Sequence, residues 1–501
     1  MSRSRIVRGV RSTRLAFAVA AWLLAASQAA AGGLTVTVPG DYATIQEAVD
    51  AVQSNASPGE VVVESDGVFD ELVVINESVT LRAGAGFSPT LEQVGSALGT
   101  LLLFGDPDDE TEVVVEGLTV RLVDSGSAAA VSIRNVSDSD RLEVRLAGVV
   151  IEVENSGFGV RAESGNGGAV DLEIVDSTVE VVGAQAGSPS CMRLGGVGYD
   201  LDAFIAGNRF RFSDADGLVL LGGGNQDEKD YAVLANVFES FASAVGEGRV
   251  GVQVQGWATS MTNLSSADVL LLSNLFVANE RAIRAFSSFE HEILLVATNN
   301  TIVDTRFNAV EIGAVADSAI TAGLANNVIA GTMGIPGEGG GFGVIVETSD
   351  QGVVDLIRSH NLLFDNAAGD YGGIAMPGPG DLFADPLFVA PAGGDYRLLA
   401  SSPAIDAGDN EPAPAGGVGL FDLALGPRIL DGDLDGVAIV DIGAYERVTQ
   451  PLEVPALSTV SLLLFAVLLA AAAAWRLHVV FPGGTSSASR IERRSREGGG
   501  R

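Results

Sequence analysis

The chain has 501 residues, of which 63 are glycine, and this length and glycine content favour a large, turn-rich β structure over a helical protein. Its formal net charge is −35, and residues 34–450 alone carry 61 acidic and 18 basic residues. A body of this charge repels nucleic acid and anionic lipid, so we exclude both as its partners and expect a soluble surface that attracts divalent cations.

The first 31 residues have the three parts of a secretory signal peptide. Five arginines form a positive n-region, residues 15–26 form an apolar h-region, and Ala29, Ala30 and Ala31 form a small-residue cleavage site. The alternative is an uncleaved anchor, but an apolar run of 12 residues is too short to span a bilayer. We expect export across the inner membrane, with the mature chain beginning near Gly32.

A short amphipathic helix is predicted just after residue 43. Thr44 can cap it, and Glu47 can complete a capping box, while Ile45, Ala48, Val49 and Val52 share one apolar face. Such a helix can cover the exposed edge of a first strand. Short aliphatic runs at 60–64, 67–71, 72–75 and 79–84 then predict strands.

Three motifs in this region carry a family resemblance. They are Tyr42-Ala43-Thr44-Ile45-Gln46 with Ala48-Val49-Asp50-Ala51, Gly67-Val68-Phe69 with Glu71, and Val79-Thr80-Leu81 with Gly84. Together they resemble the entry coil of the pectin-lyase-like β-helix superfamily, and pectin methylesterases begin similarly. The resemblance implies a parallel β-helix and leaves the chemistry open, because many functions share this fold.

Residues 84–116 are less regular, and we predict a loop there. An acidic run lies at Asp106-Pro107-Asp108-Asp109-Glu110. A solvated acidic loop is the favoured interpretation of this run, and calcium binding is the alternative.

The middle of the chain repeats one short motif, in which an asparagine precedes a few aliphatic residues or a phenylalanine. Successive asparagines are 28, 38, 26, 27 and 34 residues apart, and periods of 20–50 residues are typical of solenoids. The segments between them are short, aliphatic and broken by Gly, Asn and Asp, as expected of strands. The asparagines are Asn208, Asn236, Asn274, Asn300, Asn327 and Asn361, and related motifs begin at Gly117, Gly148 and Ser177.

These repeats predict a right-handed parallel β-helix over residues 34–380, with one coil per period. Stacked coils place the same position in a row along the axis, so a repeated asparagine can form a ladder of side-chain amides while its apolar neighbour fills the core. The alternative is that each asparagine merely occupies a turn, where it tolerates left-handed backbone. Six asparagines in the same context favour the ladder.

Candidates for catalysis on such a fold are scattered. A polygalacturonase needs two carboxylates around the scissile bond, and Asp214-Ala215-Asp216-Gly217 resembles only part of that family's pattern. The other motifs of polygalacturonases and pectin methylesterases are missing, and no spacing singles out a lyase base. We therefore name no catalytic residue. The residues considered were Arg193, Arg209, Arg211 and Lys229 as bases, His291, His360 and His478, and Tyr199 and Trp257 as sugar-stacking rings.

Residues 381–450 carry a second set of motifs. Among them are Asp385-Pro386-Leu387-Phe388, Pro403-Ala404-Ile405-Asp406-Ala407-Gly408 and Asp441-Ile442-Gly443-Ala444-Tyr445-Glu446. They resemble the choice-of-anchor Q region that closes many bacterial surface β-helix proteins, which implies an anchoring segment downstream. We expect the region to cap the far end of the solenoid.

One acidic loop in this region is a candidate calcium site. Asp431, Asp433 and Asp435 alternate and Gly436 is sixth, as at the start of an EF-hand loop, and Asp441 lies one place before the twelfth position. Ordinary turn chemistry is the alternative that the sequence favours. We predict no other cofactor.

An uncharged apolar segment at 454–475 is long enough for a transmembrane helix. The arginines of the tail, 476–501, predict that the tail is cytoplasmic and the acidic body outside. Val454-Pro455-Ala456-Leu457-Ser458 before this segment resembles the bacterial sorting signals of the Ile-Pro-Thr-Leu type. The long tail favours a plain membrane anchor.

The sequence therefore predicts an exported, membrane-anchored, monomeric bacterial protein whose body is periplasmic or extracellular. Our first hypothesis is adhesion or glycan binding without catalysis. The alternative is a polysaccharide lyase or glycoside hydrolase that acts on uronate-rich polysaccharide, and a cleft with clustered carboxylates and a basic residue would favour it.

Overall fold

The computed structural model describes residues 33–449, apart from 56, 107–108, 136–139, 165–167, 184–188, 196–199, 224–227, 242–249, 258–265 and 413–417. These residues belong to the first of two compact units, which ends at Thr449. The predicted signal peptide, transmembrane helix 454–475 and tail 476–501 lie outside the described residues. Within the described ranges, no helix is both long and apolar enough to cross a membrane.

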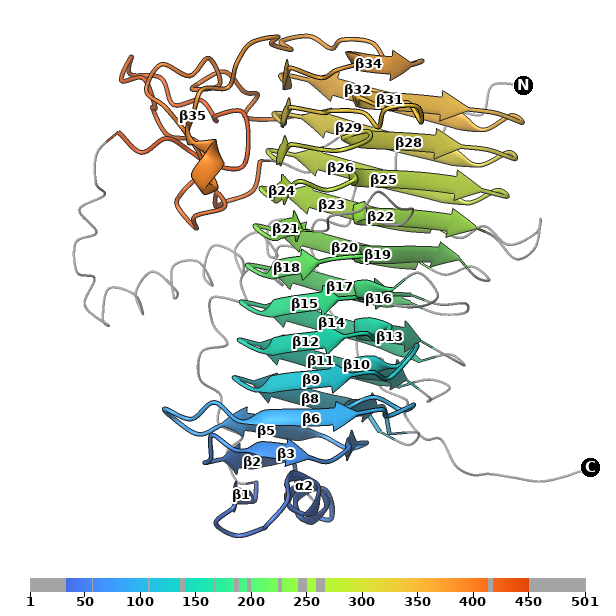
Figure 1. Cartoon of the computed structure of the whole chain (residues 1–501), viewed down its shortest axis with the longest axis vertical. Coiled ribbons are helices and arrows are strands. Elements are labelled where there is room, and N and C mark those ends of the chain that lie inside the picture. Colours follow the sequence, from blue (N-terminus) through green and yellow to red (C-terminus); the bar gives the residue numbers. More distant parts are fainter. Residues whose placement is uncertain are drawn as a thin grey trace, which may run out of the picture. The chain divides into compact units, whose positions relative to one another are not determined.

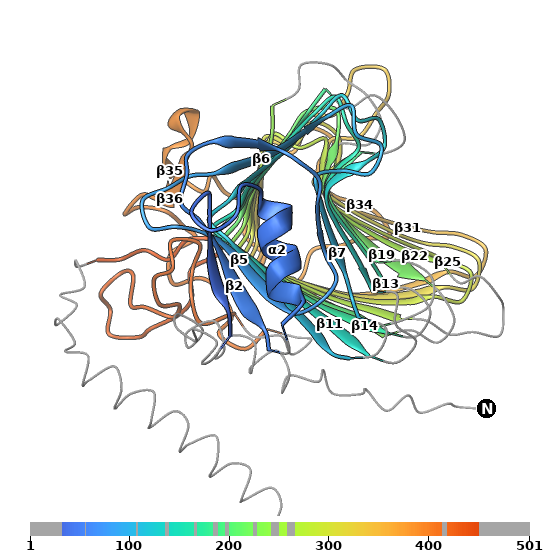
Figure 2. The ribbon, with the colours of Figure 1, turned by 90° about the horizontal axis from the view of Figure 1, so that it is seen from below.

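The chain winds through three parallel sheets, here called A, B and C, which enclose one core (Figures 1 and 2). Each coil places one strand in sheet A, then one in B, then one in C. This confirms the predicted parallel β-helix, which is of the right-handed type. Sheet A consists of β1 (Thr35–Val38), β2 (Gly59–Val63), β5 (Val79–Ala83), β8 (Thr111–Glu116), β11 (Arg141–Ala147), β14 (Ala169–Val175), β17 (Leu201–Ala206), β20 (Glu228–Leu234), β23 (Ser266–Leu272), β26 (Glu292–Thr298), β29 (Ala319–Ala325) and β32 (Val353–Ser359).

Sheets B and C have eleven strands each. Sheet B consists of β3 (Val68–Asp70), β6 (Thr90–Val94), β9 (Thr119–Val123), β12 (Val150–Glu154), β15 (Thr178–Val182), β18 (Arg209–Phe212), β21 (Val237–Ser240), β24 (Leu275–Val277), β27 (Thr301–Val303), β30 (Val328–Ala330) and β33 (Leu362–Phe364). Sheet C consists of β4 (Val73–Ile75), β7 (Leu101–Phe104), β10 (Ala129–Asn135), β13 (Phe158–Ser164), β16 (Ser190–Leu194), β19 (Asp216–Gly223), β22 (Val250–Trp257), β25 (Arg281–Ser288), β28 (Val310–Ala314), β31 (Phe342–Thr348) and β34 (Gly369–Gly373).

The loop predicted for residues 84–116 is wrong, because this segment contains β6, β7 and β8. Each of these strands pairs in register with strands of the coils on both sides. The alternating aliphatic residues of Leu101–Phe104 fill the core, with Leu101 and Leu103 fully buried. Neighbouring coils supply the partners that this short segment lacks on its own, so local irregularity in sequence misled the prediction.

Two-residue turns join sheet A to sheet B in nine consecutive coils. The first turn residue has a left-handed backbone in every one, from Gly117 (φ 68°) to His360 (φ 53°). The second turn residue points into the turn and is asparagine in the last six coils. Its buried side chain bonds to the next coil, so this turn geometry is what aligns the asparagines.

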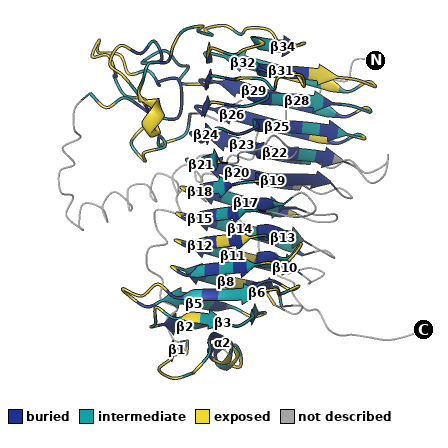
Figure 3. Ribbon diagram, viewed as in Figure 1, coloured by how far each residue is buried: buried dark blue, intermediate teal, exposed yellow. Residues whose placement is uncertain are grey.

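The predicted asparagine ladder is confirmed. In Asn274, for example, the backbone N–H and Nδ2 both donate to Oδ1 of Asn300 at 3.0 Å, and Nδ2 also donates to a carbonyl of the preceding coil. Each of the other linked pairs repeats this pattern. Two residues after the ladder position, Phe210, Phe238 and Phe276 stack with centroids 4.8 and 4.9 Å apart and are fully buried, so the apolar neighbours do fill the core. Buried residues recur on the strands of successive coils (Figure 3).

The predicted entry helix is α2 (Ile45–Gln53), which lies across the open start of the coils (Figure 2). Thr44 Oγ1 accepts the Glu47 N–H at 3.2 Å, as expected of its cap. The carboxylate at the helix start comes from Glu71, which accepts the N–H groups of Ile45 and Gln46 at 2.8 and 3.0 Å. Glu71 therefore both complements the positive end of the helix and ties it to the first coil.

Residues 383–449, here called the lobe, contain β35 (Phe388–Ala390), the 3₁₀ turn η1 (Pro391–Gly393) and β36 (Asp395–Leu398). The lobe lies on the flank of the solenoid beside β24, β27 and β30 (Figure 1). The far end is covered by the segment before it, where Ala375 enters the core and Asp381 bonds to Asn361. The end cap and the lobe are thus different segments.

Side chains of three left-handed turn residues hold the lobe. Asn299 Nδ2 donates to the Asp441 carbonyl at 2.8 Å, and Asn326 exchanges two bonds with the Asp409 backbone at 2.8 and 2.9 Å. Ser273, one coil earlier, accepts from Arg428 at 2.9 Å. Among the described residues, no side-chain bond of this kind joins the lobe to the equivalent residues of earlier coils, which are Gly117, Gly148, Asp176, Gly207 and Ala235.

Candidate functional site

The outer faces of the three sheets carry different charge. On sheet A, six consecutive coils align carboxylates in one row, with adjacent strands about 4.8 Å apart. Like charges opposite one another are destabilising, and the pKa of Glu143 is raised by burial and by its neighbours Asp171 and Glu112. The row is Glu112, Glu143, Asp171, Asp202, Asp230 and Asp268.

Sheet B presents a mixed row instead, in which arginines lie between glutamates. Arg121 contacts Glu92 at 2.7 Å and Glu152 at 3.7 Å, and Arg211 contacts Glu180 at 2.6 Å. These cross-coil ion pairs offset the charge of this face. The row is Glu92, Arg121, Glu152, Glu180, Arg211 and Glu239.

Sheet C carries the most basic of the three rows. This row includes Arg161, Arg193 and Arg284, and Glu311 is its one carboxylate; Glu163 and Glu347 lie in the neighbouring outward row of the same sheet. The full row is Leu102, Ser132, Arg161, Arg193, Val219, Gln253, Arg284, Glu311 and Ile345. This row therefore carries a net positive charge on an otherwise acidic chain.

Arg161 and Arg193 are register partners on adjacent strands of sheet C. Both guanidinium carbons lie over the ring of Phe158, at 5.6 and 6.0 Å from its centroid. Arg161 is held by Glu163 through Nε at 2.7 Å and through Nη2. Burial, and then the charge of Arg161, lower the pKa of Arg193.

A second charged group lies three coils further along sheet C. Glu311 accepts from Arg281 Nε at 2.9 Å and from Arg284 Nε at 3.2 Å, and Arg281 also donates to Glu280 at 2.6 Å. Arg281 lies 4.3 Å over the ring of Phe307. The two arginines hold the pKa of Glu311 below its usual range against the effect of burial. In this group the charges of the two arginines are balanced by the carboxylates of Glu280 and Glu311.

Asp216, which the sequence placed in a polygalacturonase-like motif, starts strand β19 of sheet C and is 3% exposed. Its Oδ1 accepts the Val250 N–H at 2.8 Å. Burial raises its pKa to about 7, with a smaller contribution from Glu280. Asp216 is thus a carboxylate that can hold a proton near neutral pH, beside the arginine row.

The other candidate bases lie elsewhere. Arg209 and Arg211 are on sheet B in ion pairs with glutamates. Lys229 points into the core and donates to the Gly223 carbonyl at 2.9 Å. His291 is fully buried, and neither ring nitrogen has a hydrogen-bond partner; burial and the charge of Lys229 lower its pKa to about 4.

The described structure shows no binding or catalytic site at the remaining residues that the sequence suggested. His360 occupies a left-handed turn position. His478 and Tyr199 lie outside the described residues, and the Trp257 side chain is not described.

The structure brings together only part of the predicted calcium set. One carboxylate oxygen each of Asp431, Asp433 and Asp406 lie within 4.8 Å of one another. Asp435 Oδ1 accepts the Val437 N–H at 2.8 Å instead. Asp441 is fully buried and accepts N–H groups of Asp406 and Arg447 at 2.8 and 2.6 Å. The sequence missed Asp406, which lies 25 residues before Asp431.

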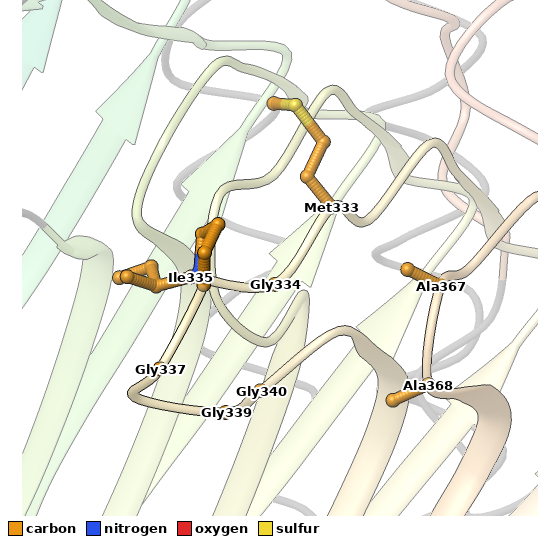
Figure 4. A pocket seen from close by; sticks show the side chains of 9 residues that line it. Met333, Gly334, Ile335, Gly337, Gly339, Gly340, Ala367 and Ala368 are labelled. Carbon is orange, nitrogen blue, oxygen red and sulfur yellow. The ribbon is translucent and has the colours of Figure 1, made fainter.

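A shallow open depression of about 300 Å³ lies at the loop 333–341 (Figure 4). The loop closes on itself through the bridge between Ile335 and Gly339. Its lining consists of Met333, Ile335 and Pro336, four glycines, Ala367 and Ala368, without an ionisable side chain. It offers apolar contact and backbone groups, and it is separate from the arginine row.

Comparison with known proteins gives two similarities. A family model described as "Disaggregatase related" matches residues 280–415, which span the coils from β25 to β34 and the first part of the lobe. The solved structure of PfbA, a surface adhesin of Streptococcus pneumoniae, aligns with 68% of this chain and 92% of that chain, at 13% identity and a TM-score of 0.31. No curated protein matches this chain.

Proposed function

We propose that this protein is an exported, membrane-anchored bacterial surface protein whose β-helix binds extended glycans along the outer face of sheet C, without catalysis. The observation that carries the proposal is the sorting of charge among the three faces. An extended ligand that contacts successive coils meets repeated carboxylates on sheet A and paired charges on sheet B. On sheet C it meets a row of three arginines and one glutamate, together with amide and aromatic groups.

The chemistry of that row suits sugars. Gln253 offers an amide, Arg284 lies 6.0 Å over the Phe286 ring, and Phe158 lies beneath two guanidinium groups. Aromatic faces and fixed polar groups are the usual lining of ligand sites. Spaced about 4.8 Å apart by the sheet, these side chains form a repeating track suited to a polymer.

Binding of the purified full chain to a panel of neutral, uronate and sulfated oligosaccharides tests this function. We expect binding to at least one class, lost when Arg284 is replaced by Glu and kept when Arg209 on sheet B is replaced by Glu. Absence of binding to every class, or equal loss in both variants, would overturn it.

The proposal includes the finer assignments made from the sequence. These are membership of the pectin-lyase-like superfamily, a choice-of-anchor Q region over the lobe, cleavage of the signal peptide near Gly32, and anchoring through 454–475. The two-residue turns, the asparagine ladder and the entry helix support the first of these. The other three rest on sequence motifs alone.

Calcium is proposed at Asp406, Asp431 and Asp433. Three carboxylates that converge from two segments of the lobe supply the oxygen ligands that calcium prefers. Asp406 also accepts the Asp433 N–H at 2.6 Å, so an ion there would tie the two segments together.

A polysaccharide lyase or hydrolase is the second candidate function. The buried carboxylate of Asp216, with its pKa of about 7, favours it, because a general acid needs a proton near neutral pH. Release of unsaturated or reducing ends from pectin or alginate would establish catalysis, and its loss in Asp216→Asn would assign the residue.

A further inference from the structure

We propose that Arg161 and Arg193 form a binding site for one anionic group, a carboxylate or a sulfate ester, carried by an acidic sugar. The inference rests on the proposed glycan binding and names the chemical class of the ligand. It assigns the position on sheet C where that group is held.

The two guanidinium groups are brought together by the stacking of coils. Arg161 in β13 and Arg193 in β16 are register partners, so their strands are about 4.8 Å apart. Both side chains extend over the same ring, that of Phe158, which is 6% exposed. Both cations therefore lie against one aromatic ring, and the Arg161 side chain remains 41% exposed.

Their charges are incompletely compensated. Glu163 takes two of the Arg161 nitrogens, Nε and Nη2. Within the described part of the chain, Arg193 makes no hydrogen bond or salt bridge. By contrast Arg82, Arg121, Arg209, Arg211, Arg281 and Arg284 each pair with a carboxylate.

Such a pair is unfavourable when empty. Like charges directly opposite one another on adjacent strands are destabilising, and partial burial of Arg193 weakens the screening by water. A bound anion removes this cost, because it faces both cations at once. Guanidinium groups bind carboxylate and sulfate-like oxygens through two parallel N–H bonds, so the Arg193 fork and the remaining Arg161 nitrogen suit such a group.

The surroundings select the type of ligand. The body carries a large excess of acidic residues, which repels nucleic acid and other dense polyanions. A single anionic group on an otherwise neutral polar chain meets less of this repulsion. Uronic acids and sulfated sugars have this character.

The test compares Arg193→Gln with Arg209→Gln in the full chain. Each variant removes one arginine charge, the first from sheet C and the second from sheet B. Sodium sulfate and sodium acetate, at ionic strength matched with sodium chloride, serve as probes of the anion site through the shift in Tm. Trigalacturonate, a sulfated disaccharide and neutral maltotriose serve as sugar probes in calorimetric titration.

We expect acetate or sulfate to raise the Tm of the wild type, and Arg193→Gln to abolish that shift. The acidic sugar that carries the same anionic group as the effective probe should bind at least tenfold more weakly to Arg193→Gln than to the wild type. Its affinity for Arg209→Gln should equal its affinity for the wild type. Without probes, Arg193→Gln should keep or raise the Tm, since it removes a like-charge contact, and this shows that the variant folds.

If Arg193→Gln binds the anions and the acidic sugars as tightly as the wild type, the anion site is refuted. If maltotriose binds in that case, the proposed glycan binding remains and only the anion site is lost. If the small anions bind through Arg193 but no sugar binds at all, the sugar assignment falls together with the proposed function.

Discussion

Asp381 ends the asparagine ladder in the place of a seventh asparagine: its Oδ1 accepts the backbone N–H of Asn361 at 2.9 Å and Nδ2 of Asn361 at 3.3 Å. At the other end, Ser177 begins the ladder, since its backbone N–H donates to Asn208 Oδ1 at 2.9 Å. The buried row of amides therefore ends at Asp381, whose carboxylate accepts both bonds from Asn361. At the other end it is preceded by Ser177, whose Oγ accepts the Val149 N–H at 3.1 Å and donates to the Val175 carbonyl at 2.8 Å.

Replacing Asn300 by Ala should destabilise the solenoid by at least about 3 kcal/mol, because each buried polar group left without a partner costs about 1–3 kcal/mol. The substitution removes the acceptor for the Asn274 N–H and Nδ2, and the donor to Asn327. Urea unfolding measures the change. Exposed Asn76→Ala is the control and should shift stability by less than about 0.5 kcal/mol. Equal effects of the two substitutions would contradict a structural ladder.

Arg428→Ala should release the lobe. Arg428 and Glu446 form an ion pair at 3.1 Å, and both side chains are 1% exposed. Arg428 also donates to Ser273 on the solenoid. Removing one partner of a buried pair costs about 3–5 kcal/mol because the other charge stays buried and unpaired. Limited proteolysis should then cut within 383–449 while the coils stay protected.

The control for this prediction is Arg397→Ala in the same lobe, since that side chain pairs with Asp395 on the surface. Arg397→Ala should leave the cleavage pattern unchanged. Cleavage within the coils of Arg428→Ala, rather than within the lobe, would mean that the pair stabilises the whole unit and not the docking of the lobe.

Asp216 should contribute to the free energy of unfolding of the wild type, and this contribution should fall as the pH rises from about 4 to 7. The pKa of Asp216 is about 7 in the folded protein, above the ordinary 3.8 of an aspartate, so the folded state holds this proton more tightly. The resulting stabilisation is complete below the ordinary pKa and is lost as the pH rises through the folded pKa. Asp216→Asn removes this term while its Oδ1 can still accept the Val250 N–H. The Tm of the variant relative to the wild type should therefore increase between pH 5 and pH 8, and a constant difference would refute the buried proton.

Calcium should raise the Tm of the wild type above its value in a chelator, if the lobe binds the ion as proposed. Asp406→Asn and Asp431→Asn should each abolish this rise, because their oxygens belong to the converging group. Asp435→Asn is the matched control from the same loop and should keep the rise, since its carboxylate bonds to Val437. Loss in Asp435→Asn with retention in Asp406→Asn would favour an EF-hand-like ligand set.

The sequence by itself determined the coil. Its period, and the asparagine after a left-handed turn residue, recur because every coil must make the same tight turn between sheets A and B, and this constraint is local. The same locality made the entry helix and its Thr44 cap predictable.

Only the tertiary structure decided which side chains from different coils meet. The lengths of successive coils vary, so alternation along one strand tells which residues face outward but not which outward residue of the next coil lies beside them. The pairing of Arg161 with Arg193 and the charge sorting of the three faces follow from that register. The meeting of Asp406 with Asp431, and the use of Asn299 and Asn326 to hold the lobe, likewise follow from packing between segments distant in sequence.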